Sequence, residues 1–592
     1  MDARYDVLIC GGGLAGLTLA RQLHREFPDL SVAVAEKTRR PIPEATHKVG
    51  ESSVELGSQY FESLGLKDYL LENHLIKFGL RFFPGGGQKP VEQRVEIGPV
   101  NHPIVNSYQI DRGRFETDMR QMITDDGVTL LEGVSVKDVV LGSGEEDHSA
   151  VLESDEGRQG VTARWLVDAT GRAGLLRGKL KLKRGGGHEA SSGWYRVKGR
   201  VDINNLSSPG AHRFRSVPES EHRWLSTTHL MGEGYWVWII PLSSGNTSIG
   251  VVCHEHVHGF DEIRTLERTQ AFLQKHEPVL AKHLESFEVM DFGCIKNFCH
   301  TISRAWHPDR WALVGEAGAF PDPLYSPGSD YIAIANTFTA EMIRADRAGD
   351  DLLPRSQELN IQYRALIGGT IDLYKNAAEV YGNGRVMATK VYWDDHVYWS
   401  YPCQYFLQGI YKLRGDALTP FGEVGARFVE LSHRMQHMLQ FWARNYRETP
   451  DDRAEDGAIL AVPTFPSILV DGHVALEKKM SVEETLAYMK KQLALAEGLF
   501  SELTLRIISE LGAENTERMF AELEAHGWEL NVPEGRTEAE ALAGRARKKA
   551  LPLLAQDAER TLGAPHAVWP VPEAATWIRG LSEMSAPEPE VA

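Results

Sequence analysis

The sequence predicts an α/β fold. A Rossmann-type dinucleotide-binding domain carries an inserted mixed or antiparallel sheet, and a mainly helical region follows it. Three observations support this prediction. A glycine-rich turn joins an apolar strand to a helix at the start of the chain, strand-like segments broken by Gly, Asn and Ser run from about 185 to 299, and helical periods dominate after about 355.

The first 36 residues form the pattern of a dinucleotide-binding unit. A short apolar run, Val7 to Cys10, precedes G-x-G-x-x-G and a helical segment, and a second apolar run ends in Glu36. Gly11 permits the tight turn, Gly13 lets a pyrophosphate approach the backbone, and Gly16 lets helix and strand pack closely. We expect the phosphates to lie at the helix N-terminus. The nucleotide contacts predicted for this unit are Gly11, Gly13, Leu14, Ala15, Gly16, Glu36 and Lys37.

The side chain of Glu36 limits the identity of the nucleotide. It can accept hydrogen bonds from both ribose hydroxyls and would repel a 2′-phosphate. The sequence therefore favours FAD or NAD over NADP.

Length and charge narrow the class of protein. A chain of 592 residues suggests two to four domains. Its 64 basic and 82 acidic residues give a net charge of −18, which disfavours nucleic acid or an anionic membrane as the main partner. The five cysteines are scattered with no C-x-x-C pair, so we expect a reducing, cytoplasmic setting and no metal site. We also expect no signal peptide and no transmembrane segment.

Between Glu36 and residue 355, predicted helices and strands alternate along the chain. A helix is predicted over about 54 to 73 and a strand starts near Phe82. A further strand ends in D-A-T-G-R, Asp168 to Arg172, and a hairpin is predicted where Tyr235 to Leu242 is followed by a Ser-Ser-Gly-Asn turn. An apolar strand near 311 leads into a loop over 315–330 and a long helix from about Tyr331 to Arg347. A helix N-terminus there would stabilise negative charge on a reduced flavin.

The remaining residues divide into a helical region and a tail. We predict a core domain over 1–355 with the inserted sheet at about 78–110 and 185–299, a helical region over 356–555, and a flexible tail over 556–592. Residues 392–411 contain eight aromatic side chains, against about two expected from the average of 9%. These aromatics either pack helices onto the core or form a wall around a flat apolar substrate.

Three motifs resemble the flavin-dependent halogenases of the para-hydroxybenzoate hydroxylase-like FAD superfamily. Trp236 to Pro241 matches the W-x-W-x-I-P signature of that family, Gly50-Glu51-Ser52 its G-E-S loop, and Lys77 to Phe82 the context of its active-site lysine. The first match is the most specific, because six positions with two tryptophans rarely arise by chance. The resemblance covers residues 5 to about 345, and it is nearest to members acting on phenols and pyrroles.

The resemblance implies an activity and a set of site residues. The enzyme would use reduced FAD from a separate NAD(P)H-dependent reductase, O₂ and chloride or bromide, and would halogenate an electron-rich aromatic or carrier-tethered substrate. Lys77 would hold the oxidised halogen, as a haloamine or by a hydrogen bond, and the two tryptophans would keep substrate away from the flavin. Catalytic roles fall on Lys77, Trp236, Trp238 and Glu51, further FAD contacts on Ser52, Arg112, Asp168, Gly315, Glu316, Gly328 and Ser329, and halide contacts on Ser326, Gly328 and Ser329.

Two departures from the family pattern leave alternatives open. Tyr325 stands where tryptophan halogenases have a glutamate, which favours a phenolic or other electron-rich substrate over free tryptophan. Pro327 has no N–H to offer a halide. One alternative is therefore an FAD-dependent monooxygenase or oxidoreductase that hydroxylates, epoxidises or dehydrogenates without halide. Another is a non-catalytic flavoprotein of a biosynthetic complex. Substrate, reductase and oligomeric state do not follow from the sequence.

Overall fold

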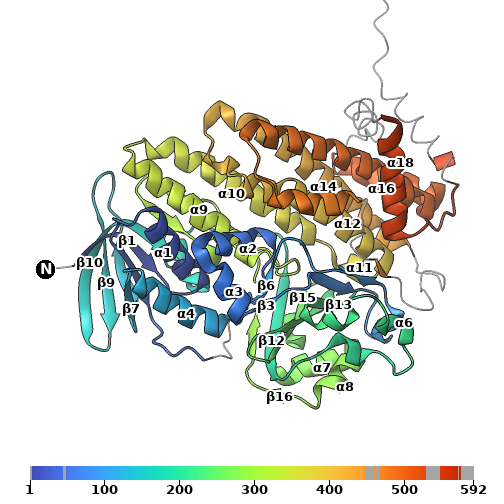
Figure 1. The fold of residues 1–592 in the computed structure, drawn as a ribbon, viewed down its shortest axis with the longest axis horizontal. Helices are drawn as coiled ribbons and strands as arrows, with labels where there is room; N and C mark the ends of the chain where they lie inside the picture. Colours follow the sequence, from blue (N-terminus) through green and yellow to red (C-terminus); the bar gives the residue numbers. More distant parts are fainter. Residues whose placement is uncertain are drawn as a thin grey trace, which may run out of the picture.

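The computed structural model describes residues 3–43, 49–446, 459–460, 467–527, 547–570 and 573–574. Figure 1 shows a sheet with helices that contains the N-terminus, a second sheet beside it, and a layer of long helices that lies over both. The predicted fold class, a Rossmann-type domain with an inserted sheet and a helical C-terminal region, is confirmed. In the described ranges, no helix is both long enough and apolar enough to span a bilayer.

The first sheet carries the dinucleotide-binding turn. Its main strand order is β19-β20-β10-β1-β2-β7, and β8 and β9 extend it on the β10 side. The pairings of β1 with β2 and β10 are parallel, and Cys10 lies opposite both Ala35 and Asp168. The carboxyl ends of these strands therefore meet at one edge, where such sheets bind their ligands. The strand bounds are Trp306–His307, Trp311–Leu313, Gly157–Asp168, Ala3–Cys10, Val32–Glu36, Thr129–Glu132, Ser135–Val140 and His148–Ser154.

Five helices pack around this sheet and lead towards the second one. They are α1 (Leu14–Glu26), α2 (Glu55–Phe61), α3 (Lys67–Asn73), α4 (Arg112–Asp125) and α9 (Gly328–Arg347). The helix predicted over 54–73 is interrupted at Gly65, whose φ of 74° is left-handed. Helix α9 begins three residues before the predicted start at Tyr331, and this places Gly328 and Ser329 in its first turn.

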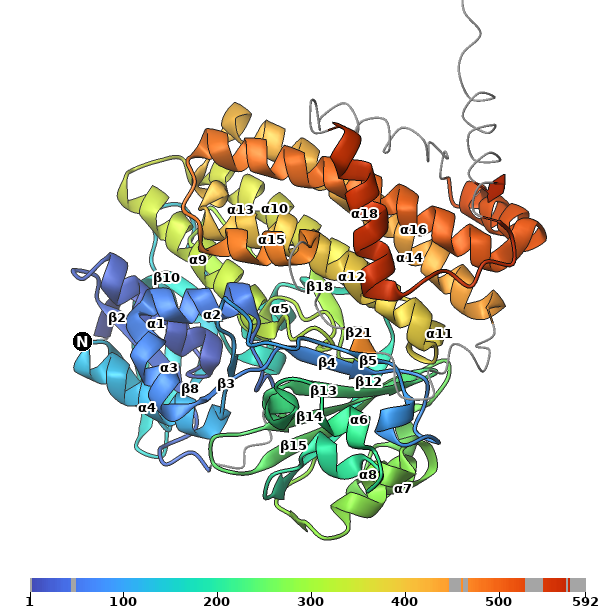
Figure 2. The same cartoon turned by 45° about the vertical axis from the view of Figure 1, so that its right-hand side comes forward.

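The second sheet is mixed and lies beside the first (Figure 2). Its order is β16-β12-β15-β14-β13-β4-β5-β21, and β17 also pairs with β12. The predicted hairpin is present as β14 and β15, with Trp238 opposite Gly250; a Cβ at Gly250 would lie 2.1 Å from the Trp238 indole. The strand bounds are Glu288–Val289, Ala190–Lys198, Thr247–His254, Tyr235–Pro241, Thr227–Gly232, Leu80–Phe83, Glu96–Ile97, Ile459–Leu460 and Gly293–Ile295.

Shorter elements complete the part before residue 350. Two small ladders pair β3 with β6 and β11 with β18, and helices α6, α7 and α8 cover the outer side of the second sheet, as Figure 2 shows. Their bounds are Leu75–Ile76, Tyr108–Gln109, Lys183–Gly185, His300–Ile302, His212–Arg215, Leu266–His276 and Pro278–Leu284. Helix α5 (Leu175–Lys179) follows the turn after Asp168.

The C-terminal helices form one layer over both sheets. The long helix α16 starts with a capping box formed by Ser481 and Glu484 and is kinked at Gly512. Helix α18 and Trp569 pack against α16, so part of the region predicted as a flexible tail from 556 is folded; residues 575–592 lie outside the described ranges. The helix bounds are Leu352–Tyr374, Ala378–Tyr381, Gly384–Ser400, Pro402–Leu407, Thr419–Asn445, Ile468–Val474, Val482–Ala525 and Arg547–Leu562 for α10 to α16 and α18.

Candidate active site

The glycine turn after β1 has the geometry that a pyrophosphate requires. Gly11 has a φ of 115°, in the region that favours glycine. A Cβ at Gly16 would lie 2.0 Å from the Gly11 carbonyl oxygen, so only glycine allows α1 to approach the strand. Gly13 caps α1 with no side chain of its own, which leaves the first N–H groups of the helix for a ligand.

Two carboxylates at the strand ends hold this region in shape. Glu36 accepts hydrogen bonds from the Gly12 N–H at 2.7 Å and the Thr38 N–H at 2.8 Å. Asp168 accepts from the N–H of Thr170 at 3.0 Å and of Leu176 at 2.7 Å. Asp168 therefore fixes the turn that follows its strand, whereas Glu36 lies beside the glycine turn where a ribose would bind.

A groove continues from the glycine turn towards the second sheet. It is lined by Leu14, Gly50, Glu51, Ser52, Arg112, Arg172, Trp236, Trp238, Gly315, Glu316, Ser326, Gly328 and Ser329, among others. Four buried polar atoms along this groove have no hydrogen-bond partner among the described residues: Ser192 Oγ, Trp194 Nε1, Trp236 Nε1 and Ser329 Oγ. Because buried polar groups are normally paired, a groove with four unpaired groups fits a polar ligand such as FAD.

The remaining predicted cofactor residues lie along the same groove or next to it. Burial raises the pKa of Glu316, and the charges of Arg172, Arg112 and Arg177 oppose this effect. Arg112 also donates to the Val49 carbonyl at 2.8 Å and so orders the loop before Glu51. Ala15 contacts the chain at Gly315, while Lys37 is exposed at the end of β2.

Glu51, which was predicted to be catalytic, is held in a buried ion pair. Its carboxylate is buried and lies 2.6 Å from the Arg196 guanidinium, which also binds Asp291 at 2.6 Å. Burial raises the pKa of Glu51, although Arg196 opposes this. Glu51 lines the groove and not the cavity described below. Its ion pair ties the G-E-S loop to β12, and a catalytic role for it stays a prediction.

The first turn of α9 lies at the end of the groove. Ser326 has a φ of 56° and Pro327 caps the helix. The first backbone hydrogen bond into the helix is donated by Tyr331 to the Pro327 carbonyl, so the N–H groups of Gly328 and Ser329 have no backbone acceptor. The positive end of a helix with unpaired N–H groups is a suitable place for an anion or for the reduced flavin edge.

An aromatic layer separates this groove from a second cavity. Trp236 and Trp238 project from the same face of β14, with ring centroids 5.9 Å apart, and both line the groove. The His229 ring lies 5.4 Å from Trp236 and stacks at 4.6 Å on Phe82, which faces the second cavity. Burial lowers the pKa of His229 to about 3, so this ring is neutral. Tyr331 lines both spaces.

Lys77 lines the second cavity and not the groove. Its side chain is 1% exposed, and Nζ donates a hydrogen bond of 2.8 Å to the Ser53 carbonyl. Burial lowers the pKa of Lys77 to about 7, against the opposing charges of Glu55 and Asp330. A lysine with this pKa is partly a free amine near neutral pH, which is the form that acts as a nucleophile.

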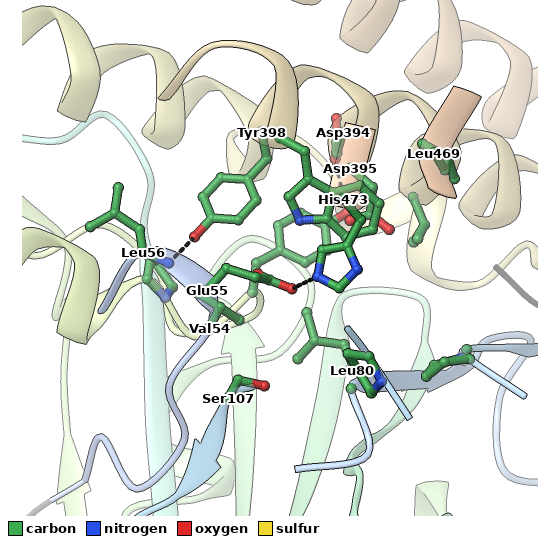
Figure 3. Close-up of a pocket in the computed structure, with 18 of the residues that line it drawn as sticks. Val54, Glu55, Leu56, Leu80, Ser107, Asp394, Asp395, Tyr398, Leu469 and His473 are labelled. Carbon is green, nitrogen blue, oxygen red and sulfur yellow. Dashed lines mark hydrogen bonds and ion pairs between the residues drawn. The ribbon is translucent and has the colours of Figure 1, made fainter. Parts of the chain in front are cut away.

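The cavity beside Lys77 has a volume of about 380 Å³ and lies between the second sheet and the helical layer (Figure 3). Its walls are largely apolar and aromatic, and include Leu80, Ile97, Leu366, Val391, Tyr392, Tyr398, Trp399 and Leu469. Three of the eight clustered aromatics line it, while others, such as Trp393, pack within the helical core. Both interpretations of that cluster therefore apply. Apolar walls with polar side chains placed among them are typical of small-molecule sites.

Four carboxyl groups face the cavity, and the sequence analysis did not single out any of them. Glu55 lies 3.4 Å from His473 Nε2 of α15. Asp330 accepts from the Tyr398 hydroxyl at 2.7 Å, and burial raises its pKa to about 7. Figure 3 shows Asp394 and Asp395 together on the wall formed by α12. An acidic pair inside an aromatic-rich helical segment was the only local signal that could have indicated them.

Tyr325, at the position of the family glutamate, is held by the helical layer. Its hydroxyl donates to Asp394 at 2.8 Å, and Asp394 also binds Lys390 and Gln436 at 2.8 and 2.9 Å. The groups of this network are buried, and the Asp394 carboxylate accepts hydrogen bonds from the donors around it. Tyr325 therefore closes the cavity wall without offering a free carboxylate.

Comparisons with known proteins agree with this architecture. The sequence model of the tryptophan halogenase family matches residues 86–372, and that of the NAD(P)-binding Rossmann-like domain matches 9–72. The flavin-dependent halogenase chlA of Dictyostelium discoideum is 29% identical over 426 residues, which cover 67% of this chain and 70% of chlA. The 1H-pyrrole-2-carbonyl-[peptidyl-carrier protein] brominase of Pseudoalteromonas luteoviolacea is 24% identical over 59% of this chain and 79% of its own.

Solved structures support the fold. The crystal structure of halogenase PltM has a TM-score of 0.60 at 15% identity and covers 94% of this chain and 99% of PltM. The flavin-dependent brominase Bmp2 has a TM-score of 0.52 at 22% identity and covers 64% of this chain and 87% of Bmp2. At these identities the likeness extends to the fold alone.

The glycine turn, the groove and the superfamily fold define an FAD-dependent enzyme whose groove and lysine-containing cavity are separate spaces. The chain is similar to flavin-dependent halogenases over much of its length, as its W-x-W-x-I-P, G-E-S and lysine motifs predict. The glycine turn and the groove fit FAD, the cofactor that flavin-dependent halogenases use, and when bound FAD would supply the redox chemistry with O₂. Members of this family generally need a separate flavin reductase.

Proposed function

We propose that this chain uses reduced FAD, O₂ and chloride or bromide to halogenate an electron-rich aromatic bound in the cavity beside Lys77. The observation that carries the proposal is the separation of the two spaces. Trp236, His229 and Phe82 stand between the groove and the cavity. A small oxidant such as hypohalous acid could pass where Tyr331 borders both spaces, whereas a substrate ring in the cavity would not reach the flavin.

Lys77 is the residue that receives the oxidised halogen in this proposal. It is the only lysine among the described residues that line the cavity, and its pKa of about 7 makes a free amine accessible. A buried amine can bind hypohalous acid or form a haloamine without competition from water. The nearby Glu55 and Asp330 keep the protonated form from being lost altogether, because their charges favour it.

The halide would bind at the first turn of α9. Ser326, Gly328 and Ser329 line the groove there, and the N–H groups of Gly328 and Ser329 have no backbone acceptor. Pro327 removes one donor from this site, so we propose a halide site with fewer N–H contacts than the family pattern. Pro327 is also the observation that favours the alternative, a monooxygenase that needs no halide.

Partners and setting complete the proposal. Reduced FAD would come from an NAD(P)H-dependent reductase, since the first sheet carries one dinucleotide fingerprint. All five cysteines are free thiols, which supports a reducing cytosol. A carrier-tethered substrate is the second possibility for the acceptor, by analogy with the carrier-protein brominase among the relatives.

The test is turnover of the purified protein with FAD, a reductase, NADPH, O₂ and bromide. A panel of phenols, indoles, pyrroles and carrier-bound acyl groups is read by mass spectrometry. We expect a brominated product from at least one phenol or pyrrole. Oxygenated products that form equally well without bromide would instead establish the monooxygenase.

A further inference from the structure

The four carboxyl groups of the cavity differ in whether they already have a partner. Asp330 is satisfied by the Tyr398 hydroxyl and the Gly57 N–H, at 2.7 and 2.8 Å. Glu55 lies 3.4 Å from His473. Asp394 has three partners in Tyr325, Lys390 and Gln436 (see above). These three carboxyl groups are therefore committed to the protein.

Asp395 has no such partner. Within the described ranges, no side chain or N–H donates a hydrogen bond to its carboxyl group and no cation pairs with it, although the residue is partly accessible and lines the cavity. Figure 3 shows Asp395 beside Asp394 with no dashed line to a neighbour. Burial raises its pKa, and the charges of Glu55 and Asp394 raise it further.

An unpaired carboxyl group in an apolar cavity is costly for the folded protein. Desolvation of such a group without a hydrogen bond is unfavourable, and more so when the group is charged. A donor brought by a ligand would offset this cost. Residues that reduce stability in this way are typical of functional sites.

The charges around the cavity limit what that ligand is. Four carboxyl groups line it, no arginine does, and the basic side chains among its described lining residues are Lys77, His102 and His473. A carboxylate or phosphate on the ligand would find no arginine, would be desolvated by apolar walls, and would be repelled by whichever of the four carboxyl groups are ionised. An uncharged aromatic with an O–H or N–H would meet apolar walls and an unoccupied acceptor.

We propose that Asp395 is the substrate-binding residue that accepts a hydrogen bond from an O–H or N–H on the aromatic ring, and that the cavity selects uncharged, donor-bearing aromatics over carboxylated ones. The part of this inference that concerns the reaction at Lys77 rests on the proposed function. The part that concerns binding of the aromatic to Asp395 does not. The hydrogen bond would increase electron density in the ring and fix which ring carbon faces Lys77. Tyr325, in the loop before α9, has no carboxyl group at the position of the family glutamate. Asp395 of α12 would instead provide a carboxyl group to the substrate.

The test measures binding to the full-length protein without turnover. Three ligands share one ring system: 1-naphthol, 1-methoxynaphthalene, which lacks the donor, and 1-hydroxy-2-naphthoate, which adds a carboxylate. Calorimetry on the wild type should give a dissociation constant for 1-naphthol roughly twofold to tenfold below that of the ether, the range for a hydrogen bond between uncharged groups. The naphthoate should bind more weakly than 1-naphthol.

Two substitutions at Asp395 separate a binding role from a structural one. Asp395→Leu should erase the preference for 1-naphthol over the ether, and Asp395→Asn, which keeps an acceptor oxygen, should restore part of it. Neither variant should melt below the wild type, because each removes an unpaired carboxyl group. The matched control is Asp394→Asn, one residue away, which should lower the melting temperature because its three partners lose a charge-assisted bond.

The outcomes are distinct. An unchanged preference for 1-naphthol in Asp395→Leu would overturn the proposal, as would a lower melting temperature with an equal loss of all three ligands. Ligand preference as expected, with no brominated product from the wild type, would refute the proposed function and leave this assignment standing. Bromination of phenols without any preference at the binding step would refute this assignment alone.

Discussion

Replacing Lys77 by Met should stabilise the protein at neutral pH. Burial holds the pKa of Lys77 at about 7, against an ordinary value of 10.5. At about 1.36 kcal/mol per pKa unit, and with the folded-state amine half deprotonated at pH 7, this difference corresponds to about 4 kcal/mol of unfavourable free energy. Met is apolar and of similar length, so it avoids this cost. It leaves the Ser53 carbonyl without its donor, at about 1–3 kcal/mol, and the net stabilisation should be roughly 1–3 kcal/mol.

The sign of the effect should change with pH. Between pH 7 and pH 10.5 the unfolded chain binds more protons at Lys77 than the folded chain, so wild-type stability rises with pH in this window. At pH 10 the cost of Lys77 has fallen to about 0.7 kcal/mol, which is less than the loss at Ser53. The Met variant should therefore be more stable than wild type at pH 7, and equally or less stable at pH 10.

The assay is urea unfolding of the cofactor-free protein at both pH values, followed by circular dichroism. Lys137→Met is the matched control, since Lys137 is exposed on β8 and its replacement should change stability by less than about 0.5 kcal/mol. A Lys77→Met protein that is less stable at pH 7, or whose difference from wild type is the same at both pH values, would show that Lys77 is not the desolvated amine described here.

Three further predictions concern the cofactor, the halide and the partner. Gly13→Val should fold, because Gly13 has a φ of −89° that valine also adopts, but should lose FAD by absorbance because the side chain occupies the space of the pyrophosphate. Pro327→Ser restores an N–H donor and should lower the KM for chloride roughly tenfold, whereas an unchanged KM would place the halide elsewhere. Reduction of bound FAD by NADPH should require an added reductase; rapid reduction without one, with substrate present, would contradict the predicted partner.

The sequence was sufficient for the parts of the site that are local in the chain. Gly11, Gly13 and Gly16 report the turn directly, because their spacing is set by a single strand and helix. Trp236 and Trp238 share a face because strand side chains alternate. The fold class followed from the same periodicities.

The carboxyl groups of the cavity could not be predicted in this way. Glu55 follows the G-E-S loop, Asp330 is in the first turn of α9, and Asp395 and His473 come from two helices of the C-terminal layer. Their proximity depends on how that layer packs over the second sheet. Asp395 also lacks a partner among the described residues because Tyr325, Lys390 and Gln436 bind Asp394 instead. The spacing of residues in the sequence does not indicate which of the two carboxyl groups these side chains bind.

The boundaries of helices were harder to predict than their existence. Helix α9 begins at Gly328, directly after Pro327, and this places Ser329 in the first turn. Helix α16 continues past Gly512, where a left-handed φ of 77° allows a kink.

In the proposed reaction, Lys77 carries an oxidised halogen to a substrate that the flavin does not touch. The direct measurement is product formation by Lys77→Ala beside wild type, with FAD, reductase, O₂ and bromide, on whichever substrate the wild type brominates best. Loss of a catalytic relay should lower brominated product on the order of a thousandfold or more, while FAD affinity stays at the wild-type value. Product from the variant within tenfold of wild type, with no dependence on bromide, would contradict the account and favour direct oxygen transfer.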